Sequence, residues 1–180
     1  MGDVNTDDLV VIDESGFPLN LTTLYGRAPL NERLKMPAPL HAKKVSAIGA
    51  ISKEEILDIA LIEGTVDQSC VESFIEHSLL PKLRAGNILL IDNAPVHDME
   101  KINNLLWSVG AVALPLPRYS PDLSPIEPCW GKLKEIIKRI KPRTTGELYN
   151  AFVNAIDEID SDDLENWYEN CGWDLEHQAA

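Results

Sequence analysis

Hydrophobic residues in the first third of the chain come in short, β-branched runs rather than at helical spacing. Three such runs are typical of strands that pair in antiparallel succession: DLVVIDE at 8–14, VSAIGAI at 45–51 and LDIALIE at 57–63. The turn-like SKEE separates the second run from the third. Residues 15–44 have no clear periodicity, so we expect a loop or a hairpin insertion there.

After residue 66 the pattern alternates between helical and strand spacing. Helices are indicated by apolar residues three and four positions apart, and strands by short apolar runs bounded by glycine or polar residues. The predicted elements are a helix from Asp67 to Gly86, a strand at 88–91, a helix at 98–109, a strand at 111–116, and helices at 125–140, 145–159 and 162–170. The order β-β-β-α-β-α-β-α with appended helices predicts an α/β domain around a five-stranded mixed sheet.

Length and composition favour one domain over residues 1–180, without repeats or a linker. No run approaches 18 apolar residues, and the N-terminus is acidic where a signal peptide would be basic. We therefore expect a soluble, cytoplasmic protein with no membrane partner. The three cysteines are odd in number and far apart, which indicates reduced thiols.

The net charge of −13 is unevenly distributed. Residues 144–180 contain ten acids and no Lys or Arg, whereas a basic stripe precedes them. Such a stripe is either a solvated helix face or a phosphate-binding surface, and both interpretations stay open. The candidates for phosphate contact are Lys132, Lys134, Lys138 and Arg139.

Two of the predicted strands end in the same way, VVID at Asp13 and LLID at Asp92. An apolar strand that finishes in an acid places the carboxylate at the rim of the sheet, where open α/β sheets bind ligands. If these two strands are parallel neighbours, both carboxylates emerge at one end of the sheet.

Glu127 is a third candidate, delivered to the start of a helix by a segment rich in proline. Proline restricts the backbone, so the run PRYSPDLSPIEP at 117–128 is stiff and would hold Glu127 in place. A structural role is the alternative, because Ser124 to Glu127 fits a capping box with Ser124 as the N-cap.

Three converging carboxylates repel one another unless a cation holds them. Oxygen ligands of this kind suit Mg²⁺ or Mn²⁺. A pair of such ions about 3.5–4 Å apart can drive an in-line phosphoryl displacement. The sequence therefore predicts a site for two divalent ions at Asp13, Asp92 and Glu127.

Four stretches of the sequence together resemble a known family. They are VIDESGF at 11–17, YGRAP at 25–29, LIDNAPVH at 90–97 and LPRYSPDLSPIEPCW at 116–130. The chain resembles the DDE-type transposase catalytic domain of bacterial insertion sequences related to the mariner group. The resemblance extends from about residue 8 to residue 173 and implies an RNase H-like fold.

By this resemblance Asp13, Asp92 and Glu127 are the catalytic acids, and the 34 residues between the last two are a spacing that the family shares. His97 would lie near the site, or support its loop, and Asn93 would orient a ligand. The implied reaction is metal-dependent hydrolysis at a transposon end, followed by attack of the freed 3′-hydroxyl on target DNA. The basic stripe would then contact DNA.

Family members carry helix-turn-helix modules before this domain, and only seven residues precede the first predicted strand. The expectation is that these modules are absent, and that a full-length transposase or a separate DNA-binding subunit is a partner. A noncatalytic remnant or a regulatory, protein-binding partner of a transposase is the alternative function. A phosphotransfer receiver domain is disfavoured, because the antiparallel pair at 45–63 breaks its β-α alternation.

The tryptophans are the last feature that needs an assignment. Trp107 and Trp130 fall on apolar helix stripes, so we expect both in the core rather than stacked on bases. The pattern leaves Trp167 and Trp173 undecided.

Overall fold

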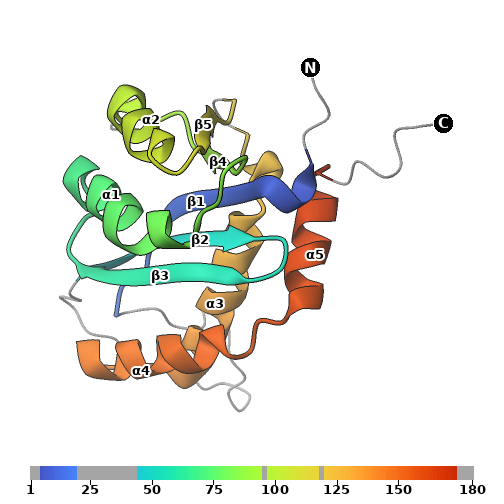
Figure 1. Ribbon diagram of the computed structural model, residues 1–180. Coiled ribbons are helices and arrows are strands. Elements are labelled where there is room, and N and C mark those ends of the chain that lie inside the picture. The colour runs from blue at the N-terminus through green and yellow to red at the C-terminus, as the bar shows by residue number, and fades with distance from the viewer. Residues whose placement is uncertain (1–4, 20–43, 95–96, 118–119, 174–180) are drawn as a thin grey trace, which may run out of the picture.

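The computed structural model describes residues 5–19, 44–94, 97–117 and 120–173. Five strands form one sheet in the order β3-β2-β1-β4-β5 (Figure 1). Their bounds are β1 Leu9–Gly16, β2 Val45–Ser52, β3 Ile56–Glu63, β4 Ile88–Ile91 and β5 Val112–Pro115. Most of the expected loop at 15–44 lies outside the described residues, and β1 continues through its first two positions.

The direction of the strands decides where the candidate acids emerge. β1 pairs with β2 in antiparallel and with β4 in parallel orientation, in a register that sets Val11 beside Leu90. Because β1 and β4 are parallel neighbours, their carboxyl ends meet at one edge of the sheet. Asp13 lies in β1 and Asp92 directly follows β4, so both acids lie toward that edge.

Helices cover both faces of the sheet, with α1 and α2 on one side and α3, α4 and α5 on the other (Figure 1). The helices are α1 Gln68–Phe74, α2 Met99–Trp107, α3 Ile126–Ile140, α4 Thr145–Ile156 and α5 Ser161–Asn170. Short 3-10 turns lie at η1 Thr6–Asp8, η3 Leu80–Lys82 and η4 Pro121–Leu123. The mixed five-stranded sheet and its helices confirm the predicted fold class.

Alternation along β1 assigns each side chain to one of two cores. Leu9 and Val11 pack in the cluster under α3, α4 and α5, while Val10 and Ile12 pack in the cluster under α1 and α2. Successive side chains of a strand point to opposite faces. Asp13 therefore points toward α3.

The predicted helix at 67–86 is not one regular α-helix. α1 begins after the Asp67 cap and ends at Phe74, a π-turn follows at η2 Ile75–Leu79, and the 3-10 turn η3 completes the segment. Pro81 lies in that last turn and has no N–H to donate, so the α-helical ladder cannot continue through it.

The prediction for Trp107 is wrong, whereas that for Trp130 is confirmed. Trp107 is 81% exposed and Trp130 is 1% exposed. Trp107 is the last residue of α2, and the buried stripe of that helix consists of Ile102 and Leu106. One residue past a buried position is a turn of about 100° around the helix, which points the Trp107 ring away from the sheet.

Both edges of the sheet have side-chain caps on their backbone groups. On β5, the backbone N–H of Ala113 donates a hydrogen bond to Oδ1 of Asn103, and Pro115 has no N–H to donate. On β3, Asp58 accepts the amide of Ile59, and Lys82 donates to the carbonyl of Leu57. Backbone groups that are already hydrogen-bonded cannot pair with a further strand, so these contacts disfavour the addition of a strand at either edge.

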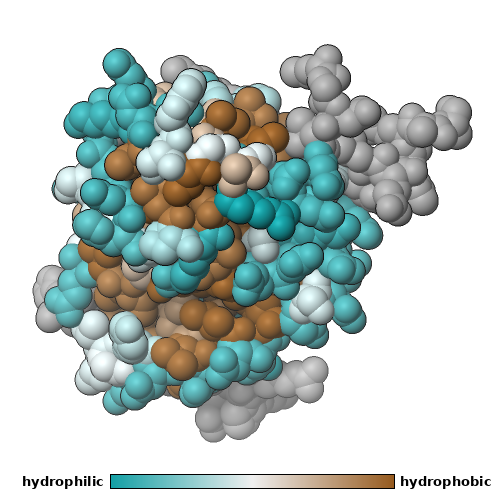
Figure 2. Space-filling model, in the orientation of Figure 1, coloured by the Kyte–Doolittle hydropathy of each residue, from teal (hydrophilic) through white to brown (hydrophobic). Residues whose placement is uncertain are grey.

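The capping on β3 matters because this strand is apolar and half-buried along most of its length. Figure 2 shows hydrophobic residues gathered in the middle of the face on which β3 is the front strand.

In the described part of the chain no helix is long and apolar enough to cross a membrane.

Candidate active site

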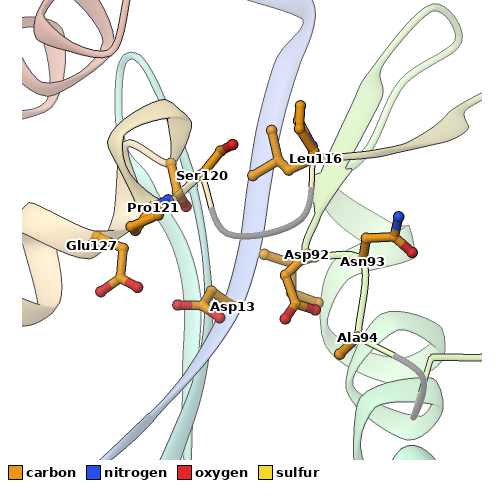
Figure 3. Close-up of a pocket in the computed structure, with 11 residues that line it drawn as sticks. Asp13, Asp92, Asn93, Ala94, Leu116, Ser120, Pro121 and Glu127 are labelled. Atoms are coloured by element: carbon orange, nitrogen blue, oxygen red, sulfur yellow. The ribbon is translucent and has the colours of Figure 1, made fainter.

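The three predicted acids line one cavity of about 390 Å³, although they come from three different elements. Asp13 extends from β1, Asp92 follows β4, and Glu127 lies in the first turn of α3. Figure 3 shows the three carboxylates in a row, with Asp13 between Glu127 and Asp92. The residues around the cavity are Ile12, Asp13, Asp92, Asn93, Ala94, Leu116, Pro117, Ser120, Pro121, Ser124 and Glu127.

Asp13 is held by a hydrogen bond from the core. The indole Nε1–H of Trp130 donates to Oδ2 of Asp13 over 3.0 Å. The pKa of the Asp13 carboxyl is raised to about 7, mainly by burial and also by the charges of Glu14 and Glu127. A hydrogen bond from the backbone at Glu14 and the indole bond lower it, but by less. The ionised carboxylate is therefore costly in the absence of a cation.

Asp92 is held by a histidine and is far more accessible. Nε2 of His97 lies 2.7 Å from Oδ1 of Asp92, and the His97 side chain is 3% exposed against 52% for Asp92. The bond from His97 lowers the pKa of Asp92, and the same bond raises the pKa of His97. Because Nε2 faces the carboxylate, this nitrogen carries a proton, and Nδ1 is buried without a hydrogen-bond partner among the described residues.

Glu14 is a residue that the sequence analysis missed. Its Oε1 lies 3.8 Å from Nε2 of His97, so the same imidazole nitrogen faces the carboxylates of Glu14 and Asp92. Burial raises the pKa of Glu14, while His97 lowers it. The signal was present in the alternation of β1, because the residue after Asp13 must point to the opposite face of the sheet, where His97 lies.

The capping-box interpretation of Glu127 is wrong. α3 begins after Pro125, which makes no side-chain cap, and the amide of Ser124 donates to the carbonyl of Pro121 over 3.1 Å. The Ser124 N–H is therefore already used and does not donate to the Glu127 carboxylate. It lines the cavity instead.

Comparison with known proteins identifies a family, a curated relative and solved structures of the same fold. The sequence model described as DDE superfamily endonuclease matches residues 8–149, which is most of the chain. The chain belongs to the DDE superfamily endonuclease family. A curated relative of this DDE domain is the transposable element Tcb1 transposase of Caenorhabditis briggsae, 27% identical over 105 residues. That match covers 56% of this chain and 38% of the relative.

Solved structures with the same fold include the Mos1 transposase paired-end complex with left transposon end. It has a TM-score of 0.75 and 16% identity, and the match covers 92% of this chain and 52% of that chain. The catalytic domain of Mos1 mariner transposase has a TM-score of 0.65 and 16% identity, and the match covers 93% of this chain and 76% of that one. The DDE domain thus spans about half the length of the Mos1 chain in the paired-end complex.

Two further observations concern ligands for a metal ion in the DDE domain. Asn93 is exposed, and in Figure 3 its amide points away from the three acids. Among the described residues, no three His, Cys, Asp or Glu side chains lie close enough together to hold one ion. Figure 3 accordingly shows the three carboxylates in a row rather than gathered around one point.

The basic stripe of α3 is partly neutralised by acids that follow α4 in the chain. Lys132 pairs with Asp163, and Arg139 pairs with Glu158 over 3.3 Å. Lys138 makes no ion pair with the residues that the structure describes.

Lys134 has a different setting, on the side of α3 that faces β1. Its ammonium donates to the Ser15 hydroxyl over 2.7 Å and lies 5.5 Å from the centre of the Phe17 ring. Ser15 is two residues after Asp13 on the same face of β1, so this cation is close to the acids along the strand.

Proposed function

We propose that this chain acts as the catalytic domain of a transposase, which cleaves DNA phosphodiester bonds and transfers the freed strand with Asp13, Asp92 and Glu127. The observation that carries the proposal is the single cavity lined by these three acids, with Asp13 in the middle of the row. Membership of the DDE superfamily endonuclease family supports the same chemistry.

The residues present fit divalent cations. Every candidate ligand is a carboxylate, the kind of donor that Mg²⁺ and Mn²⁺ prefer. The pKa of Asp13, raised to about 7 by burial, indicates a carboxylate that a bound cation would keep ionised. We propose that Asp13, Asp92 and Glu127 would hold two such ions. When bound, such ions activate an attacking oxygen and stabilise the leaving one.

The chain itself supplies orientation. His97 orients the carboxylate of Asp92 through Nε2, and Trp130 orients that of Asp13 through its indole N–H. Glu127 needs no such bond, because the stiff backbone around Pro121 and Pro125 sets the start of α3. Preorganised ligands need little rearrangement when a charged substrate arrives, which favours the reaction.

DNA is the proposed substrate, as transposon ends and as target. The Mos1 structures include a paired-end complex with left transposon end and complexes with Mn or Mg. We extend DNA binding to this chain through Lys134 and Lys138, with Lys132 and Arg139 available once their acidic partners release them. A full-length transposase or a separate DNA-binding subunit is the proposed protein partner.

Two broader statements are parts of the same proposal. Residues 1–180 form one catalytic domain, which the single sheet packed on both faces supports. The source is a bacterial insertion sequence related to the mariner group, which the YGRAP and LPRYSPDLSPIEPCW motifs support. The alternative of a noncatalytic remnant or regulatory partner is not favoured, because it gives no reason for the cavity with its three acids.

The test is Mn²⁺-dependent nicking of supercoiled plasmid DNA by the wild type, Glu127→Gln and Glu135→Gln. Glu135 is the matched control, because it is an exposed glutamate two turns further along α3. We expect nicking by the wild type and by Glu135→Gln, and none by Glu127→Gln. Nicking that persists in Glu127→Gln would remove this residue from the site.

A further inference from the structure

We infer that Trp130 is a positioning residue for the metal-binding carboxylate of Asp13, and not simply a core residue. Its indole N–H binds one oxygen, Oδ2, and leaves the other oxygen of Asp13 without this restraint. The inference rests on the proposed function, because it concerns the same carboxylate. It gives Trp130, which the sequence pattern assigns only to the core, a role at the site.

The sheet provides the space that the indole ring of Trp130 occupies. Gly49 of β2 is the cross-strand partner of Asp13. A Cβ on Gly49 would lie 2.6 Å from Cη2 and 3.2 Å from Cζ2 of Trp130. No side chain can occupy that space while the ring is there, so the glycine allows the indole to lie against the sheet beside Asp13.

Further contacts restrict the direction of the ring. The Phe17 ring meets the indole edge to face, with centroids 6.0 Å apart and an interplanar angle of 71°. Trp130 is 1% exposed and lies within the core cluster under α3. A ring confined in this way has little rotamer freedom, so its N–H stays directed at Asp13.

The position of Trp130 along α3 links two of the three acids. Glu127 is three residues earlier, nearly one turn of the same helix. α3 therefore presents the third carboxylate and, through Trp130, holds the first. Packing uses the ring of Trp130, whereas holding Asp13 uses its N–H.

The experiment separates the N–H from the shape of the ring. Trp130 is replaced by β-(3-benzothienyl)alanine, in which sulfur takes the place of the indole N–H. The matched control makes the same replacement at Trp173, whose indole N–H donates over 2.9 Å to an uncharged acceptor, the carbonyl of Leu123. Calorimetry measures Mn²⁺ affinity, and thermal melting without metal confirms that each variant is folded.

We expect the variant at Trp130 to bind Mn²⁺ about tenfold more weakly than the wild type, the usual effect of losing a group that orients a metal ligand. The variant at Trp173 should bind as the wild type does. Equal affinity for all three proteins would overturn the inference and leave Trp130 as a packing residue.

A second measurement keeps the inference testable if the proposed function fails and even the wild type binds no Mn²⁺. In the metal-free protein, the indole proton of Trp130 is followed by NMR in the wild type and in Asp13→Ala. Loss of the hydrogen bond should move this signal upfield and speed its exchange with solvent, while the signal of Trp173 stays in place. A Trp130 signal that does not respond to Asp13→Ala overturns the inference independently of metal.

Discussion

Asp13 lies within β1 and Asp92 directly follows β4, its parallel neighbour, yet the protein holds their carboxylates in different ways. Asp13 is partly buried, accepts a hydrogen bond from a neutral indole, and has a pKa raised to about 7. Asp92 is half exposed, accepts from a histidine, and has a lowered pKa. The ionised form of Asp13 is therefore disfavoured by its surroundings, whereas the ionised form of Asp92 is stabilised.

This difference shows how a site can be prepared for cations without being stable as a cluster of charges. The exposed acid is ionised at neutral pH and can meet an incoming cation first. The buried acid becomes fully ionised when the cation offsets the cost of burial. The four predictions below test this contrast, from the largest expected effect to the smallest.

The largest effect is on catalysis, where the two acids should be equivalent. Asp13→Asn and Asp92→Asn should each lose Mn²⁺-dependent nicking by about a thousandfold, or about 4 kcal/mol of activation free energy, because each removes a charged metal ligand. Initial rates of plasmid nicking measure the loss. A residual rate within tenfold of wild type for either variant would show that its carboxylate is not a ligand.

The next effect concerns the contact between Gly49 and the ring of Trp130, which holds Asp13. Gly49→Ala should destabilise the protein by about 1–3 kcal/mol, because the new methyl group overlaps Trp130 and an overpacked core must shift. Gly131→Ala in α3 is the control, since a Cβ there meets nothing within 4 Å and alanine favours a helix. Urea unfolding compares the two, and equal stabilities would show that the Trp130 ring can move freely.

The third effect is an opposite sign for the same substitution. Without metal at pH 8, Asp13→Asn should stabilise the protein by roughly 1–3 kcal/mol, because it removes a charge that burial disfavours. Asp92→Asn should destabilise it by about 1 kcal/mol or less, since solvent screens a half-exposed pair. Urea unfolding of both variants measures the signs.

Added Mn²⁺ should reverse the order for Asp13. The wild type should gain stability with metal concentration, whereas Asp13→Asn should gain little, because binding stabilises only a folded state that holds the ion. Two variants that change stability in the same direction, with and without metal, would contradict the contrast between the acids.

The smallest effect is a pH dependence with two separable parts. The folded-state pKa of Asp13 is about 7, above the ordinary value of 3.8, so its contribution to stability is lost as the pH rises from about 4 to 7. The folded-state pKa of His97 lies above 6.5, so its contribution is full below that pH and is lost as the pH rises through the raised value.

The variants should remove these parts one at a time. Asp13→Asn should flatten the curve between pH 4 and 7, and His97→Gln should flatten it above 6.5 and cost about 1 kcal/mol at pH 6. Urea unfolding from pH 4 to 9 provides the curves. A His97→Gln curve that is parallel to the wild type would mean that the imidazole does not titrate with folding.

Local patterns in the amino-acid sequence were enough to predict the strands, the order of the elements and the two acids near the carboxyl edge of the sheet. These features depend on local periodicity: two β-branched runs finish at Asp13 and Asp92, and alternation along β1 already assigns faces. The acidic motif also indicated Glu127, since a stiff segment leads to it. Local patterns sufficed because each feature depends on neighbours along the chain.

The tertiary structure alone decided which groups hold the acids and which surface residues are free. Glu14 and His97 meet because β1 and the loop after β4 are adjacent, and Trp130 reaches Asp13 because Gly49 leaves space across the strand pair. The exposed Trp107 was mistaken for core, because a helical stripe defines a face only to within one residue. Hydrogen bonds and burial depend on distance in space, which spacing along the sequence does not specify.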